Sequence, residues 1–164
     1  FSSWFSSGEA HYNQFVEALL KGNLKEMNIY MNDVALSTFS SFDTGTHPSR
    51  RSQPERFFHG FVLGLISDLR DIYEIKSNRE SGYGRYDIML IPADIHDKTH
   101  DGIVLEFKVH DADGEATLAD TAQAALRQIE DKNYDAELIN RGIPKSRIQH
   151  YGFAFEGKKV LISK

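Results

Sequence analysis

Two short apolar segments constrain the fold of this chain more than any other feature of its sequence. They cover residues 85–91 and 103–109, are rich in isoleucine, valine, leucine and phenylalanine, and are bounded by turn-forming residues. This pattern is typical of buried β-strands. Charged side chains interrupt both segments, at Asp87 in the first and at Glu106 and Lys108 in the second. Because a charged group is costly to bury unless it is paired or binds a metal, the segments also predict a functional site.

Helical and extended patterns alternate along the rest of the chain. We expect helices near residues 15–22, 24–39, 54–69, 115–133 and 136–140, and strands at 72–77, 85–91, 103–109, 148–155 and 159–162. Residues 40–53 are rich in Ser, Thr, Gly and Pro and predict a loop. The order of these elements predicts an α/β fold, in which a mixed sheet is covered by helices on both faces.

The alternation of strand side chains assigns the charged residues to faces of the sheet. Asp87 shares its face with Met89 and Ile91, whereas Glu106 and Lys108 share a face of the later strand and lie roughly 7 Å apart along it. If the two strands are neighbours, Asp87 and Glu106 can converge. Two carboxylates, a backbone carbonyl and waters make a suitable Mg²⁺ site. Lys108 would then lie beside the metal, where it could orient or deprotonate an attacking water.

The sequence around these residues is more specific than the three charges alone. The order of Asp87 and then Glu106-Phe107-Lys108 resembles the PD-(D/E)XK nuclease superfamily. Three further stretches resemble one family within it, the nuclease-like domain at the C-terminus of bacterial AAA-ATPase-like proteins. These stretches are Phe58-His59-Gly60-Phe61, the run from Ser77 to Ile88, and Tyr151-Gly152-Phe153-Ala154-Phe155.

This resemblance carries expectations for the fold and the domains. It implies a restriction-endonuclease-like core over residues 50–164, with a mixed central sheet flanked by helices and an N-terminal helical extension. Residues 1–49 would form a helical segment and linker that pack on that core. Because the first residue is Phe1 and not methionine, we expect a fragment of a longer protein, whose N-terminal part would be an ATPase domain.

The resemblance also implies further residues of the site. Glu55 matches a helical glutamate that often assists the metal, Gln128 resembles a helical glutamine of related nucleases, and the Phe107 carbonyl would complete the metal ligands with Asp87 and Glu106. The tyrosine that often follows the glutamine is not at its usual spacing, since Tyr134 lies further along. Another interpretation of Glu55 is a carboxylate favoured by the dipole at the start of its helix.

Three other residues have two interpretations each. Arg79 and Arg85 flank a glycine-rich loop and would contact a phosphate backbone, or they belong to a hairpin with a solvated tip. His59 would contact the metal ligands without binding the metal itself, or it is a core histidine bonded to the backbone.

Composition limits the possible functions. The chain has no cysteine, which excludes disulfides, thiolate metal sites and a cysteine nucleophile. Its net charge of −5 argues against a protein that coats DNA, although a metal site is itself built from carboxylates. No apolar stretch approaches the length of a membrane span, so we expect no membrane partner, and a reducing cytoplasm fits the absence of cysteine.

Two functions follow from these observations. The first is a metal-dependent phosphodiesterase that uses Mg²⁺ or Mn²⁺ to hydrolyse nucleic acid, DNA before RNA. The second is a nuclease-fold module without catalytic activity that binds nucleic acid or a protein partner.

Overall fold

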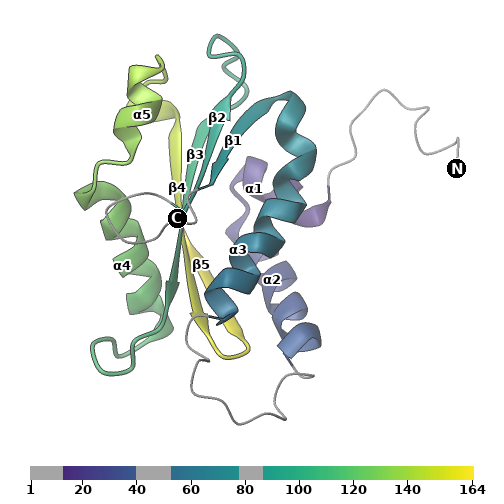
Figure 1. Ribbon diagram of the computed structural model, residues 1–164, viewed down its shortest axis with the longest axis vertical. Helices are drawn as coiled ribbons and strands as arrows, with labels where there is room; N and C mark the ends of the chain where they lie inside the picture. Colours follow the sequence, from purple (N-terminus) through teal and green to yellow (C-terminus); the bar gives the residue numbers. More distant parts are fainter. Residues whose placement is uncertain (1–12, 40–52, 78–86) are drawn as a thin grey trace, which may run out of the picture.

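The computed structural model describes residues 13–39, 53–77 and 87–164, without the side chains of residues 38–39 and 53–55. Three helices come first, followed by three strands, two helices and two strands (Figure 1). In chain order they are α1 (Gln14–Lys21), α2 (Leu24–Phe39), α3 (Gln53–Ile66), β1 (Tyr73–Ser77), β2 (Ile88–Pro92), β3 (Gly102–Val109), α4 (Leu118–Asp131), α5 (Asp135–Asn140), β4 (Ile148–Glu156) and β5 (Lys159–Ser163). Short 3₁₀ helices at Ser67–Asp71 and Lys145–Arg147 precede β1 and β4.

The five strands form one sheet in the order β1-β2-β3-β4-β5. All neighbouring pairs are antiparallel except β3 and β4, which run parallel and are joined through α4 and α5. A parallel pair requires a long crossover, and two helices supply it. The sheet lies between α4 and α5 on one side and α1, α2 and α3 on the other (Figure 1). The predicted mixed sheet flanked by helices is therefore confirmed.

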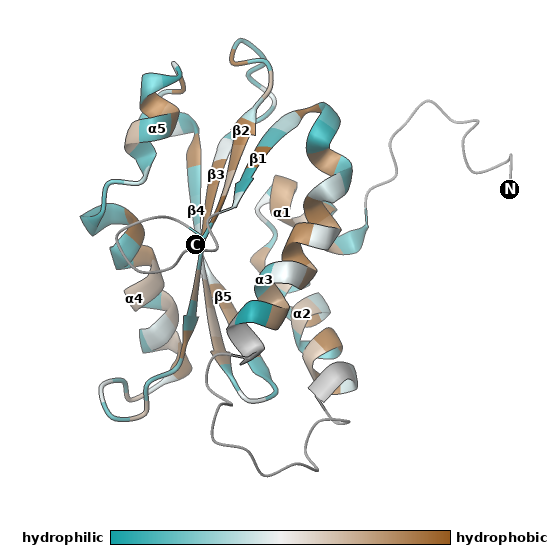
Figure 2. Ribbon diagram, viewed as in Figure 1, coloured by the Kyte–Doolittle hydropathy of each residue, from teal (hydrophilic) through white to brown (hydrophobic). Residues whose placement is uncertain are grey.

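The alternation of β2 and β3 residues builds two separate cores, and Figure 2 shows the apolar colouring of the strands between the helical layers. On the side of α1 to α3, Ile88, Leu105 and Phe107 pack in the larger core. There the Phe58 ring of α3 stacks on Phe155 of β4, with ring centroids 4.6 Å apart. Burial of such aromatic and aliphatic surface drives the layers together.

The smaller core lies under α4 and α5. Met89 and Ile91 of β2 and Val104 of β3 pack there against Ile129 of α4 and Leu138 of α5. These strand residues are the ones that share a face with Asp87 and Glu106. The site therefore lies on the side of the sheet that α4 and α5 cover.

Two asparagines of α2 bind the backbone of the edge strand β5. The Asn32 amide donates to the Val160 carbonyl at 2.8 Å and its oxygen accepts from the Val160 N–H at 3.0 Å. Asn28 repeats this pairing with Ile162, at 3.1 and 2.8 Å. An open sheet edge is a template for unwanted strand pairing, and these amides occupy it.

Most element boundaries differ from the expected ones by one to three residues, and two of the differences lie beside the site. The fourth helix was expected over residues 115–133 but spans Leu118–Asp131, because Thr117 is extended and forms a capping box with Asp120. The second strand begins at Ile88, directly after Asp87; residues 78–86 lie outside the described part of the chain. Within that part, no helix has both the length and the apolar character that crossing a membrane requires.

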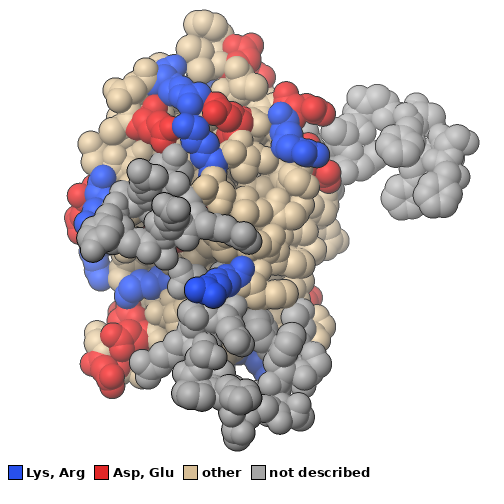
Figure 3. Space-filling model, in the orientation of Figure 1, with Lys and Arg blue, Asp and Glu red and all other residues tan. Residues whose placement is uncertain are grey.

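Charged side chains are mixed over the visible surface. On the face shown in Figure 3, basic and acidic side chains lie next to one another, and neither kind forms a continuous area over the described residues. This distribution agrees with the modest net charge of −5.

We expect the double substitution Asn28→Ala and Asn32→Ala to lower the free energy of unfolding by about 2 to 4 kcal/mol, because four hydrogen bonds to the β5 backbone are lost at about 1 kcal/mol each or less. Chemical denaturation measures this difference. Asn140→Ala, at the exposed end of α5, is the matched control and should have little effect. Equal stability of the double variant and the unchanged protein would contradict the role of the two amides.

Candidate active site

Asp87 and Glu106 meet across the pairing of β2 and β3. The ladder pairs Ile88 with Leu105, so its register continues to Asp87 opposite Glu106. The Asp87 carboxylate accepts a hydrogen bond of 2.7 Å from the Phe107 N–H. Both acidic residues are buried, with 9% and 5% of their surface exposed. The structure thus brings together the two carboxylates that the strand pattern predicted to converge.

Burial changes the protonation of Asp87. It raises the pKa of this carboxyl to about 6, against the hydrogen bonds with the Phe107 N–H and with Glu106, which lower it. A buried pair of carboxylates disfavours two negative charges without a compensating cation. A cation placed beside the two carboxyl groups would therefore favour their ionised forms.

Gln128 of α4 reaches the same pair. Its amide nitrogen donates to the Glu106 carboxylate at 2.9 Å and lies 3.4 Å from the Tyr134 hydroxyl. The glutamine that the resemblance indicated therefore contacts one of the two predicted metal ligands. This contact orients the Glu106 carboxylate from the helical layer.

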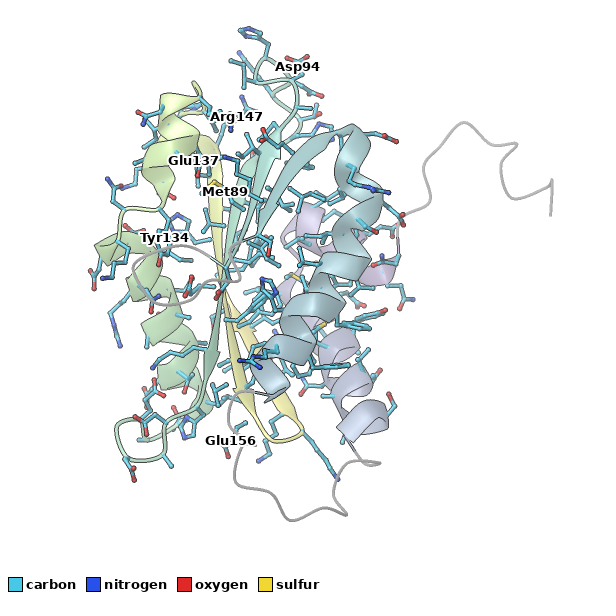
Figure 4. The ribbon with its side chains drawn as sticks, in the orientation of Figure 1. Met89, Asp94, Tyr134, Glu137, Arg147 and Glu156 are labelled. Atoms are coloured by element: carbon cyan, nitrogen blue, oxygen red, sulfur yellow. The ribbon has the colours of Figure 1, made fainter. Side chains whose placement is uncertain are left out.

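Tyr134 is a site residue that sequence reasoning did not assign. It is 5% exposed and lies at the junction of α4 and α5, as labelled in Figure 4. Burial raises its pKa, and the charges of Glu106 and Asp87 add to this effect. Asn133 has a left-handed backbone with φ 51°, which turns the chain after α4 and brings Tyr134 back toward Gln128. Asparagine tolerates this conformation, so Asn133 was the sequence signal for the turn. Helical spacing counted from Gln128 does not include it.

A glycine lets α4 approach the sheet closely enough for this contact. Gly152 of β4 is paired with Glu106 of β3. A Cβ atom at Gly152 would lie 2.5 Å from the Ala122 carbonyl oxygen of α4, a distance that requires the helix to move. The glycine therefore sets the height of α4, and with it Gln128, above Glu106.

His59 supports Asp87 from the opposite layer. The Nε2 atom of this buried α3 side chain lies 3.3 Å from the Asp87 carbonyl oxygen and 3.0 Å from the Ser77 hydroxyl. Its ring also meets the Phe107 ring edge-on, at 5.8 Å between centroids. His59 is thus a core histidine bonded to the backbone, and the backbone that it contacts belongs to the site.

Lys108 lies on the same face of β3 as Glu106, and its ammonium is paired with another residue. Lys108 Nζ donates to Glu115 Oε2 at 2.7 Å, and 36% of the lysine side chain is exposed. Glu115 lies in the connection between β3 and α4 and was not singled out from the sequence. The role assigned to Lys108 stays a prediction.

Three predicted residues lie outside the described part of the chain. They are Arg79, Arg85 and the side chain of Glu55. Their proposed contacts with phosphate or metal stay predictions.

The donor set fits a hard divalent cation. Mg²⁺ and Mn²⁺ prefer carboxylate, carbonyl and water oxygens, and the two buried carboxylates supply the first. The N–H and C=O of one strand residue point to the same side, so the Phe107 carbonyl faces the side of Asp87. Among the described residues, no group of three or more His, Asp or Glu side chains has a metal-binding arrangement.

One comparison with known proteins identifies a family. A family model described as the PD-(D/E)XK nuclease superfamily matches residues 53–164. No curated protein and no solved structure matches the chain. The matched range contains all five strands and every site residue discussed above.

We expect Asp87→Asn to stabilise the metal-free protein at pH 8 but not at pH 4. The raised pKa of Asp87, about 6, means that the folded state holds a proton that the unfolded state releases at lower pH. The contribution of Asp87 to the free energy of unfolding is therefore fully present below about pH 4 and is lost as the pH rises through about 6. The difference should be on the order of 2 kcal/mol at pH 8, measured by denaturation in EDTA.

Asp68→Asn is the control for this experiment. Asp68 is exposed in the 3₁₀ helix that precedes β1, on a part of the chain that does not contact Asp87. Its substitution should have a small and equal effect on stability at both pH values. A flat pH dependence for Asp87→Asn as well would contradict the raised pKa of the buried Asp87 carboxyl.

Proposed function

Because the chain belongs to the PD-(D/E)XK nuclease superfamily, we propose that it is a metal-dependent phosphodiesterase that cleaves nucleic acid. The observation that carries this proposal is the buried pair of Asp87 and Glu106, which Gln128 contacts from α4. A buried anionic pair without such a use would only destabilise the fold. Asp87 directly precedes β2 and Glu106 lies in the middle of β3, as expected from the sequence.

Asp87, Glu106 and the Phe107 carbonyl would hold Mg²⁺ or Mn²⁺. When bound, the ion would supply the positive charge that activates water and stabilises the phosphate during displacement. The protein's own contribution is to hold the acceptors in place. The Phe107 N–H fixes the Asp87 carboxylate, Gln128 fixes that of Glu106, and Lys108 adds an ammonium that offsets phosphate charge.

Surface charge alone does not account for nucleic-acid binding by this chain. The chain carries a net charge of −5, and basic and acidic side chains lie next to one another on the face in Figure 3. A protein that binds nucleic acid only through the phosphate backbone requires a basic surface. We propose DNA in preference to RNA as the substrate, and an ATPase domain in the parent chain; both rest on the resemblance described above.

A second candidate function is a nuclease-fold module that binds nucleic acid or a partner without cleaving it. In such a module the pair of Lys108 and Glu115 would have a structural role only. The two functions differ in one observable, which is turnover in the presence of metal.

The test is cleavage of double-stranded DNA, single-stranded DNA and RNA in Mg²⁺ or Mn²⁺. We expect Asp87→Ala and Glu106→Ala to reduce the rate about 1000-fold or more, because the metal's contribution of several kcal/mol is lost. Glu74→Gln removes a carboxylate from the exposed ion pair with Arg141 and should leave the rate unchanged.

Two results would contradict the proposal. Equal cleavage by the unchanged protein and both alanine variants would place the active site elsewhere. Absence of cleavage of all three substrates by the unchanged protein, with both metals, would favour the binding module.

A further inference from the structure

A polar cluster lies where β3 ends and the chain turns toward α4. Its centre is Glu115, whose side chain is 10% exposed. The surrounding groups are Lys108 at the end of β3, His110 and Asp111 just after it, and the fully buried Thr121 of α4. Glu156, labelled in Figure 4, is the last residue of β4.

The two oxygens of the Glu115 carboxylate have different partners. Oε1 accepts from the Asp111 N–H at 2.8 Å and from the Thr121 hydroxyl at 3.0 Å. Oε2 accepts from the Lys108 ammonium at 2.7 Å. One oxygen therefore anchors the carboxylate to the protein, and the other presents it to Lys108.

The anchor itself is held by a chain of hydrogen bonds. Because the Thr121 hydroxyl donates to Glu115, its oxygen accepts from His110 Nδ1, at 2.7 Å. The His110 backbone N–H donates to the Phe155 carbonyl of β4 at 2.8 Å. Its Nε2 lies 3.3 Å from the Glu156 carboxylate. The position of Glu115 is thus fixed by β4 and α4 together.

The charge of Glu115 is maintained in this setting. Burial acts to raise the pKa of the carboxyl, but the hydrogen bonds from Lys108, Asp111 and Thr121 outweigh it and hold the pKa below its ordinary value. Glu115 consequently remains an anion at neutral pH, as an ion pair with Lys108 requires.

We propose that Glu115 is a positioning residue that holds the Lys108 ammonium in place for phosphodiester cleavage. The inference rests on the proposed function, in which Lys108 acts beside Asp87 and Glu106. Lysine has a flexible four-carbon stem, and that of Lys108 is 36% exposed. A fixed carboxylate keeps its ammonium in one place, on the same strand face as Glu106.

The hydrogen bonds from the Asp111 N–H and the Thr121 hydroxyl hold Glu115 in this connection. The ion pair with Lys108 is not required for that, because partly exposed ion pairs contribute little to stability. The ion pair of Lys76 and Glu137 is a suitable comparison. Its lysine is 35% exposed, much as Lys108 is, but it lies on β1 and does not involve Lys108. Glu137→Gln is therefore the matched control variant.

The experiment compares the full chain with Glu115→Gln, Lys108→Met, the double variant and Glu137→Gln in steady-state DNA cleavage. We expect Glu115→Gln to lower kcat roughly 10- to 100-fold, the effect of a misplaced group, with KM changed by no more than about twofold. The double variant should match Lys108→Met, because the two residues act as one unit. Glu137→Gln should match the unchanged protein.

A second readout reports the position of the lysine without cleavage. Carbon relaxation at Lys108 Cε should show an ordered side chain in the unchanged protein and a mobile one in Glu115→Gln. Thr121→Val removes the hydroxyl that anchors Oε1, and should give a smaller change of the same kind in both readouts. This variant also serves if Glu115→Gln does not fold.

Three results would overturn the inference. They are an unchanged kcat in Glu115→Gln, additive losses in the double variant, and an equally mobile Lys108 Cε in both proteins. In each of these cases the unchanged protein still cleaves DNA, so the proposed function survives. Absence of cleavage by the unchanged protein would instead refute the proposed function, and this inference with it.

Discussion

The site depends on one hydrogen bond, from the Phe107 N–H to the Asp87 carboxylate. It continues the pairing of β2 with β3 past Ile88 and fixes the buried Asp87 carboxyl group directly opposite Glu106. Burial raises the pKa of Asp87, so the folded state carries an electrostatic cost in the absence of a cation. The rest of the structure holds these two carboxylates together in spite of that cost.

Both helical layers contribute to that constraint. From one side, α4 lies on β4 at Gly152, where its backbone leaves no space for a side chain, and brings Gln128 to Glu106. From the other side, His59 of α3 contacts the backbone of Asp87. The parallel pairing of β3 and β4 requires the crossover that α4 and α5 form. The topology and the proposed chemistry therefore depend on the same connection.

Strand periodicity predicted the sheet and the common face of Asp87 and Glu106, because alternation is a local property. The adjacency of their strands, and the contact of Gln128, came from the family resemblance. The pairing of Lys108 with Glu115 was not predictable, since it depends on how residues 110–117 turn back toward β3. The hydrogen bonds from the side-chain amides of Asn28 and Asn32 to β5 were not predictable either, since they depend on how α2 packs beside the sheet. The division between an N-terminal segment and a nuclease-like domain stays a prediction.

Calorimetric titration with Mn²⁺ tests the central claim, that the buried carboxylate pair is a metal site, without requiring turnover. We expect saturable binding of Mn²⁺ by the unchanged protein and loss of that binding in Glu106→Ala. Glu74→Gln, which removes an exposed carboxylate, should bind as the unchanged protein does. Undiminished binding in Glu106→Ala, or no binding by the unchanged protein at millimolar Mn²⁺, would contradict the claim.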